Sequence, residues 1–199
     1  MNTLWIEIEE ILAARNVLPL LKLNEGASVL ELEDLEAHVC AKLPVALRQI
    51  LLRHNGQSQG FGLFFGLQFL PVAEIKSNWD MWRSLEDDGL NEELSDSMSS
   101  EPPGFIRPLY LNRGWIPFTH DHGGNHIGID FDPDTKGTVG QIIAFGRDDD
   151  VNKLKASSFE QFLGDFASQL RTVKWEMTEK GWQFMDHEQG VHYHDWKSL

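Results

Sequence analysis

The sequence predicts an α+β fold in which helices flank a mostly antiparallel sheet. Helical spacing of apolar residues dominates the first half of the chain, and two strands joined by a short turn follow in the second half. The 199 residues include seven Trp and twelve Phe, enough for a core of their own. We therefore expect one domain over residues 1–171, followed by an aromatic C-terminal extension over residues 172–199.

Three helices are expected before the first strand. Apolar residues recur at helical spacing over residues 3–15 and again over residues 32–43, where the second helix would end before Pro44. Pro44 then lies in the first turn of a third helix, a position where the missing N–H costs little. Asn55 and Gly56 form a suitable left-handed stop for that helix.

A strand and a long excursion are expected next. The stretch GFGLFFGLQFLP, residues 60–71, is rich in Phe and Gly and is typical of a buried strand. Residues 71–83 have the pattern of a helix, and an acidic insertion near residues 84–104 would precede the return of the sheet.

The second half contains the clearest hairpin. Residues 126–131 alternate between apolar and polar, which is the pattern of a half-buried strand, and residues 132–137 carry the Asp, Pro and Gly of a turn. The partner strand is expected at residues 140–146. A last amphipathic helix follows, with Ser157 and Glu160 placed for a capping box.

Charge limits the class of partner. The formal net charge is −14, which repels a phosphate backbone, so we expect no nucleic acid and favour a basic protein partner. Residues 84–101 hold seven acidic residues and no Lys or Arg, which is typical of a solvated face or of a docking surface. The candidate partner-binding residues are Asp87, Asp88, Glu92, Glu93, Trp79 and Trp82.

Two further features bear on location. The N-terminal stretch is acidic and amphipathic, and no apolar run reaches the roughly 20 residues that cross a bilayer, so a cytoplasmic protein without membrane contact is expected. Cys40 is the single cysteine, which excludes an intrachain disulfide framework. Its place near an apolar helical stripe favours a buried small group over a nucleophile.

The stretch WIPFTHDHGGNHIGIDFDPDTKGTVGQIIAF, residues 115–145, raises the question of a metal site. His120, His122 and His126 could supply nitrogen ligands, but glycines at 123 and 124 break any helix between the histidines, so the spacing is not that of a two-turn helical metal motif. We therefore expect no metal, no cofactor and no catalytic residue. A metal-dependent hydrolase that uses these histidines is the least favoured alternative.

Three blocks carry a family pattern. LEDLEAHVCAKLPVALRQILLRHNGQ holds a Glu-containing helix, a Leu-Pro step and a helix that ends in Asn-Gly. WIPFTHDHGGNHIGIDFDP holds Trp-x-Pro, a glycine turn and Asp-x-x-Pro, and GTVGQIIAFGRDDDVNKLKASSFEQFL opens a strand with Gly-Gln. The residues are Glu36, Pro44, Asn55, Gly56, Trp115, Pro117, Asp121, Gly124, Asn125, Asp130, Pro133, Gly140 and Gln141. Over residues 28–170 the chain thus resembles the SUKH superfamily, which groups fungal cell-wall-assembly regulators with bacterial immunity proteins that neutralise polymorphic toxins.

The resemblance implies a structural role for the motif residues and a binding function without catalysis. Our first hypothesis is a bacterial immunity protein whose acidic surface covers a basic toxin domain, such as a nuclease. The alternative hypothesis is a regulator or scaffold of cell-wall synthesis, as the fungal members of the superfamily imply.

Overall fold

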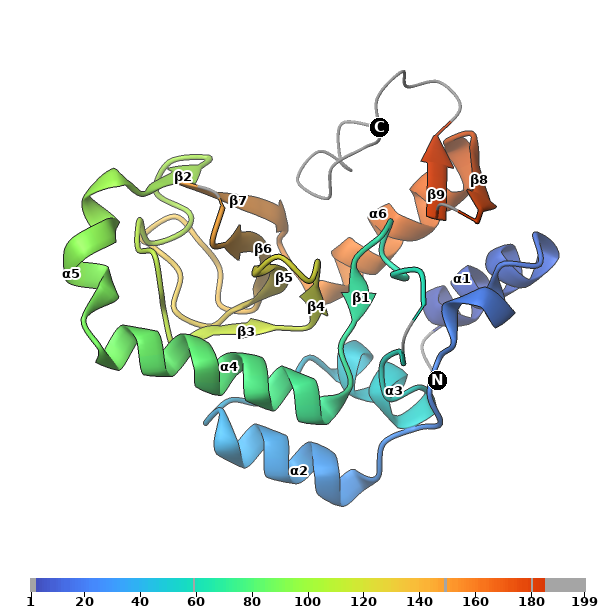
Figure 1. The fold of residues 1–199 in the computed structure, drawn as a ribbon, viewed down its shortest axis with the longest axis horizontal. Helices are drawn as coiled ribbons and strands as arrows, with labels where there is room; N and C mark the ends of the chain where they lie inside the picture. The colour runs from blue at the N-terminus through green and yellow to red at the C-terminus, as the bar shows by residue number, and fades with distance from the viewer. Residues whose placement is uncertain (1–2, 59, 149, 180, 185–199) are drawn as a thin grey trace.

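A five-stranded sheet lies at the centre of the fold (Figure 1). The computed structural model describes residues 3–58, 60–148, 150–179 and 181–184. The strand order is β2-β7-β6-β5-β3, and every pair is antiparallel except β2 with β7, which confirms the predicted α+β class. The bounds are β2 Ser99–Glu101, β3 Trp115–Pro117, β5 Asn125–Asp130, β6 Gln141–Gly146 and β7 Val151–Ala156.

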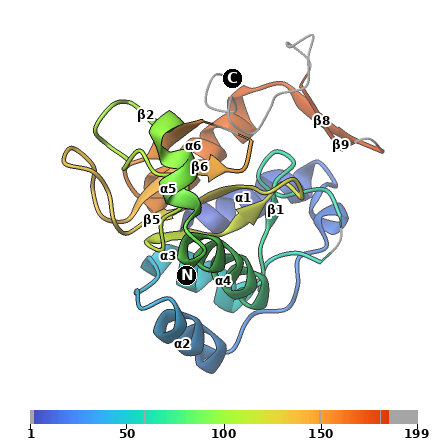
Figure 2. The same ribbon diagram turned by 60° about the vertical axis from the view of Figure 1, so that its left-hand side comes forward.

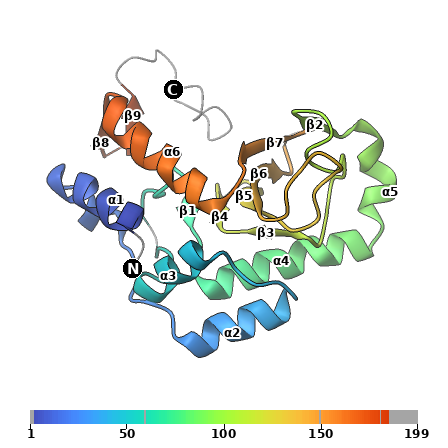
Figure 3. The same ribbon diagram turned by 180° about the vertical axis from the view of Figure 1, so that it is seen from behind.

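Helices pack on this sheet from two directions. The long helix α4 contacts β3 and carries α2 on its other side, whereas α6 contacts β6 and β7 and packs against α1 and α3 (Figures 1 and 3). The bounds are α1 Thr3–Ala14, α2 Val29–His38, α3 Val45–Arg53, α4 Val72–Asp87, α5 Leu90–Leu94 and α6 Phe159–Thr172. Short elements complete the fold: η1 Leu18–Leu21, η2 Ser95–Ser97, β1 Gln68–Phe69, β4 Thr119–His120, β8 Trp175–Thr178 and β9 Gly181–Phe184.

The core forms because α6 presents one continuous apolar stripe. Phe159, Phe162 and Phe166 are at most 1% exposed and pack near Phe64 and Phe118. The opposite face of the sheet is covered as well, by a second apolar cluster of Ile106, Trp115, Ile143 and Phe145. The prediction of a half-buried strand at residues 126–131 is therefore wrong, since every residue of β5 is buried.

The first three predicted helices are confirmed with shifted ends. A capping box between Ser28 and Glu31 begins α2 earlier than the apolar spacing indicated, and α2 ends at His38. Cys40 follows in a left-handed conformation, with φ of 54°, and is exposed, so the prediction of a buried cysteine is wrong. The cause is the early end of the helix, which takes Cys40 off the apolar stripe.

The Phe- and Gly-rich stretch is mostly not a strand. Only Gln68 and Phe69 pair as β1, while isolated bridges join Gly62 to Gly66 and Phe64 to Leu67. Phe65 and Gly66 have positive φ, which turns the chain back on itself and ends regular pairing. The apolar side chains still reach the core, as the composition indicated.

The acidic segment is built into the fold rather than forming one long excursion. Its first residues extend α4 to Asp87, α5 follows, and β2 joins the edge of the sheet beside β7 (Figure 2). The cap of the last helix also differs by one residue from its prediction, because Ser158 and not Ser157 accepts the bond from the backbone N–H of Gln161.

The described part of the C-terminal extension is a hairpin of β8 and β9. Trp175 is buried, donates its indole N–H to the Leu170 carbonyl and lies under the Arg15 guanidinium. Trp182 donates to the carbonyl of Gly62. The hairpin is thereby fixed to α1, α6 and the glycine-rich turns, whereas Trp196 lies outside the described residues.

Candidate functional site

The glycine turn before β5 is held by one carboxylate. Asp121 accepts hydrogen bonds from the backbone N–H of Gly123 and Asn125 and from the Asn125 side chain. Burial alone would raise the pKa of Asp121, but these bonds together hold it below the usual value. Gly124 takes a φ of 104°, and Asn125 also bonds Asp148 across the turn. These bonds hold the turn between β4 and β5 in place.

A second carboxylate holds the other end of β5. Asp130 is fully buried and accepts bonds from the Gln141 side chain and the Asp132 backbone N–H, while Gly140 donates to its carbonyl. Burial raises the pKa of Asp130 to about 6, against the bonds from Gln141 and Asp132 that lower it. Pro133 lies in the adjoining loop, where it packs against Gly137.

The remaining motif residues also hold elements together. Buried Glu36 accepts bonds from Lys42 and the backbone N–H of Leu43, while Pro44 occupies the N-cap of α3. Asn55 accepts a bond from the Val72 backbone N–H at the start of α4. Gly56 has no room for a side chain, because a Cβ would lie 2.2 Å from the nitrogen of Pro71.

Two motif residues belong to β3 itself. The ring of Trp115 lies 5.2 Å from that of Phe145, measured between centroids, and Pro117 pairs with Gly128 at the sheet edge. A Cβ at Gly128 would lie 2.6 Å from the carbonyl oxygen of Ile116, so the glycine permits this close pairing.

The histidine cluster divides into one buried and two accessible rings. His126 is fully buried, donates from Nδ1 to the Thr119 carbonyl and accepts at Nε2 from the Trp82 indole. Burial lowers its pKa to about 4. Because both nitrogens of His126 are engaged, it is not available as a metal ligand.

His120 and His122 border a polar pocket of about 630 Å³ together with Glu74 and Gln68. Their ring centroids are 5.3 Å apart, and burial lowers the pKa of His120. Within the ranges that the structure describes, no group of three or more His, Cys, Asp or Glu is placed to hold a metal ion.

A second pocket, of about 400 Å³, lies between α4 and the segment that precedes β3, and we call it the α4 pocket. Its walls combine the end of α2, one face of α4, β3 and the residues after β5. The lining residues are His38, Val39, Cys40, Ala41, Trp79, Arg83, Asn112, Arg113, Gly114, Ile116, Phe131 and Asp132.

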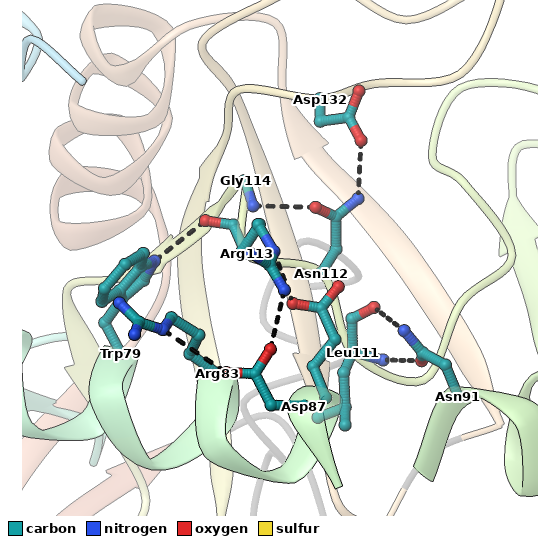
Figure 4. Close-up of polar contacts among 10 residues, drawn as sticks. Trp79, Arg83, Asp87, Asn91, Leu111, Asn112, Arg113, Gly114 and Asp132 are labelled. Atoms are coloured by element: carbon teal, nitrogen blue, oxygen red, sulfur yellow. Dashed lines mark hydrogen bonds and ion pairs between the residues drawn. The ribbon is translucent and has the colours of Figure 1, made fainter. Parts of the chain in front are cut away.

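Hydrogen bonds and ion pairs fix the rim of the α4 pocket (Figure 4). The Trp79 indole donates to the Arg113 carbonyl at 2.9 Å, and the Arg113 guanidinium lies 2.9 Å from Glu86 and 3.0 Å from Asp87. Asn112 accepts from the Gly114 backbone N–H and donates to Asp132. These contacts hold the rim of the α4 pocket in place within the fold.

The predicted partner-binding residues lie in three places: the α4 pocket and its rim, the interior and the surface. Trp79 lines the α4 pocket, whereas Trp82 is buried against His126 and presents no free face. Asp88, Glu92 and Glu93 are exposed on the turn after α4 and on α5.

The sequence reasoning missed five polar lining residues of the α4 pocket. These are His38, Arg83, Asn112, Arg113 and Asp132. One local signal was present: Asn112-Arg113-Gly114 stands directly before the Trp115 motif, and Asn followed by Gly two residues later is typical of a side-chain-capped turn.

The model of the SMI1 / KNR4 family (SUKH-1) matches residues 26–165, most of the chain. The chain belongs to this family. The matched range begins just before α2 and ends within α6, so it contains every motif residue and the whole α4 pocket.

Relatives of this family member are named as regulators. "Cell wall biosynthesis/cell cycle regulator smi1" of Schizosaccharomyces pombe is 33% identical over 77% of the chain. "Glucan synthesis regulatory protein" of Neurospora crassa is 30% identical over 79% of it, and "Cell wall assembly regulator SMI1" of Saccharomyces cerevisiae is 27% identical over 83%.

The alignments cover only part of these relatives, namely 33%, 36% and 39% of their lengths respectively. The chain thus spans about a third of the curated relatives that it matches. Among the described residues, no helix has both the length and the apolar character that crossing a membrane requires.

Proposed function

We propose that this protein is a regulator of cell-wall or glucan synthesis that acts by binding another protein. The observation that carries the proposal is how the polar residues are used. The motif carboxylates Glu36, Asp121 and Asp130 are occupied by structural hydrogen bonds. The α4 pocket is open, and helix α4 leads directly into the exposed acidic residues of α5. Such a surface suits recognition and offers no catalytic arrangement among the described residues.

The partner that fits this surface is a basic protein. The chain has a formal net charge of −14, and Asp88, Glu92 and Glu93 stand exposed beside the α4 pocket's helix. Opposite fields raise association rates and suppress partners of the same sign, which also argues against nucleic acid. We propose that the protein acts in the cytoplasm. The proposed role in wall or glucan synthesis is supported by the names of the family relatives, which describe regulators of these processes.

The test is removal of the gene in the organism of origin. Cells that lack the protein are expected to incorporate less labelled glucose into wall polysaccharide, and the wild-type gene should restore the incorporation. Unchanged incorporation, with the loss verified by immunoblot, would contradict the regulatory role.

A second arm distinguishes the immunity hypothesis. Deleted cells are grown beside wild-type siblings, whose toxin would kill cells without the matching immunity protein. If cells that lack the gene are killed while their wall synthesis is normal, the protein is an immunity protein and not a regulator. Survival with reduced incorporation supports the regulator.

A further inference from the structure

The α4 pocket combines an apolar interior with a charged rim. Val39, Trp79 and Ile116 are buried side chains that form its inner wall, and Phe131 adds a partly exposed ring. About 400 Å³ is enough for one large apolar side chain and is at the lower end for a small-molecule site. Filling it would remove apolar surface from water without opening the core.

The charged lining residues are Arg83, Arg113 and Asp132, and carboxylates of α4 outside the lining give the whole rim a net negative charge. Arg113 is held between Glu86 and Asp87, and Arg83 lies 3.7 Å from Asp87. Asp80 stands on the same helix, bonded to His38 at 2.6 Å. An incoming anion would compete with carboxylates that already occupy the guanidinium of Arg113.

A cation would compete in the same way for Asp80 and Asp87, but it also meets exposed carboxylates on the turn after α4 and on α5 that make no ion pair among the described residues. Asp80 and Asp87 are about half exposed, and the surface continues into Asp88, Glu92 and Glu93, with no Lys or Arg in residues 84–101. A lysine or arginine that flanks the apolar side chain can therefore pair with the exposed carboxylates that follow α4. The charges favour a basic ligand that carries an apolar group.

We propose that the α4 pocket receives one large apolar side chain from a lysine- or arginine-rich segment of a partner protein. The proposal rests on the proposed protein-binding function and names the segment that its partner uses. The preformed rim lowers the ordering cost on this side of the interface, because Trp79, Asn112 and Arg113 are already bonded in place.

The probes are labelled heptapeptides in which Gly-X-Gly lies between two pairs of lysines, with Leu, Trp or Ala at X. Fluorescence anisotropy with the full chain is expected to give a Kd about tenfold lower for Leu or Trp than for Ala, the factor that burial of one such side chain produces. Replacing the lysines by glutamates should weaken binding. Equal binding of the Ala peptide, or tighter binding of the acidic one, would overturn the proposal; the latter would indicate an anion site.

The single cysteine allows the α4 pocket to be blocked by chemical modification. Cys40 lines the α4 pocket and is exposed, so N-benzylmaleimide can be attached there to the folded chain. The modified chain should lose the preference for Leu and Trp. The control carries Cys40→Ser with Ala37→Cys and the same benzyl group, since Ala37 is exposed on α2 but does not line this pocket. The control should keep the preference, and its loss in both proteins would contradict the assignment.

Location is checked directly by placing benzoylphenylalanine at X and mapping the photo-crosslinks. Crosslinks on the lining residues of α2, α4 or the segment before β3 support the proposal, and crosslinks elsewhere overturn it. Peptide binding is measured on the purified chain and wall synthesis in cells. A failure of one experiment is thus distinguishable from a failure of the other.

Discussion

The two ends of β5 and the rim of the α4 pocket use the same residue types in opposite surroundings. Asn125 and Asp130 are at most 3% exposed, and each makes several hydrogen bonds within the fold. The carboxylates of Asp87 and Asp132 are about half exposed and pair with arginines at the surface. A buried polar group is costly to leave unpaired, whereas an exposed ion pair contributes little. The first region therefore stabilises the fold, and the second is free to serve binding.

Gly56→Ala should have the largest effect on stability. The new Cβ would lie 2.2 Å from the Pro71 nitrogen at a φ of 64°, so we expect a loss of about 4 kcal/mol in the free energy of unfolding. Urea denaturation measures it. Gly66→Ala is the matched control, because its φ is also positive but nothing lies near its Cβ; it should cost about 1 kcal/mol. Equal losses of stability in the two variants would show that the positive φ, and not crowding of the new Cβ, causes the destabilisation.

Two buried groups on β5 should give opposite pH dependences. The pKa of His126 is lowered to about 4, so its contribution is fully present above pH 6.5 and is lost as the pH falls toward 4. The pKa of Asp130 is raised to about 6, so its contribution is fully present below pH 3.8 and is lost as the pH rises through 6.

Single variants separate these contributions. The destabilisation caused by His126→Phe should shrink by about 3 kcal/mol between pH 7 and pH 4. That caused by Asp130→Asn should grow over the same range. Denaturation of each variant and the wild type at matched pH checks both signs, and parallel curves would contradict the assigned protonation states.

Arg113→Ala tests the rim, where the expected loss of stability is below about 1 kcal/mol. Because the substitution removes the cation from Glu86 and one of the two cations from Asp87, binding of the lysine-flanked peptides should tighten by about threefold. Anisotropy and thermal melting measure the two quantities on one sample. Weaker binding would mean that Arg113 contacts the ligand itself.

The smallest change in stability is expected on reversing the charges of Asp87, Asp88, Glu92 and Glu93 to Lys, within about 1 kcal/mol. Association with a basic partner or peptide should nevertheless slow markedly at low salt. The control reverses four exposed acidic residues on other elements, Glu10, Glu25, Glu160 and Glu176, and so produces the same net charge. If both variants slow association equally, total charge and not the acidic segment is responsible.

Local patterns predicted much of the fold but little of the pocket. Periodicity located α1, α3, α4 and α6, because a helix is set by residues within a few positions of one another. The Phe- and Gly-rich stretch misled the prediction, since positive φ at Phe65 depends on surrounding packing. The α4 pocket could not be predicted, because Trp79 and Arg113 are 34 positions apart in the sequence and meet only in the folded chain. The motif residues were found from the resemblance, and their hydrogen bonds from the structure.

Strand β2 is expected to detach from the sheet more readily than the central strands. It joins the sheet only along one side, through a parallel register that pairs Ser99–Glu101 with residues 151–153. Such a short edge can detach while β5 and β6 stay paired, because the core lies under the central strands. Amide protons of β2 should therefore exchange with solvent faster than those of β6. Each opening would release one attachment of the acidic segment, whose other attachments include the bonds between Asn91 and Leu111. A partner that binds α5 would therefore slow exchange at β2 without contact to the strand.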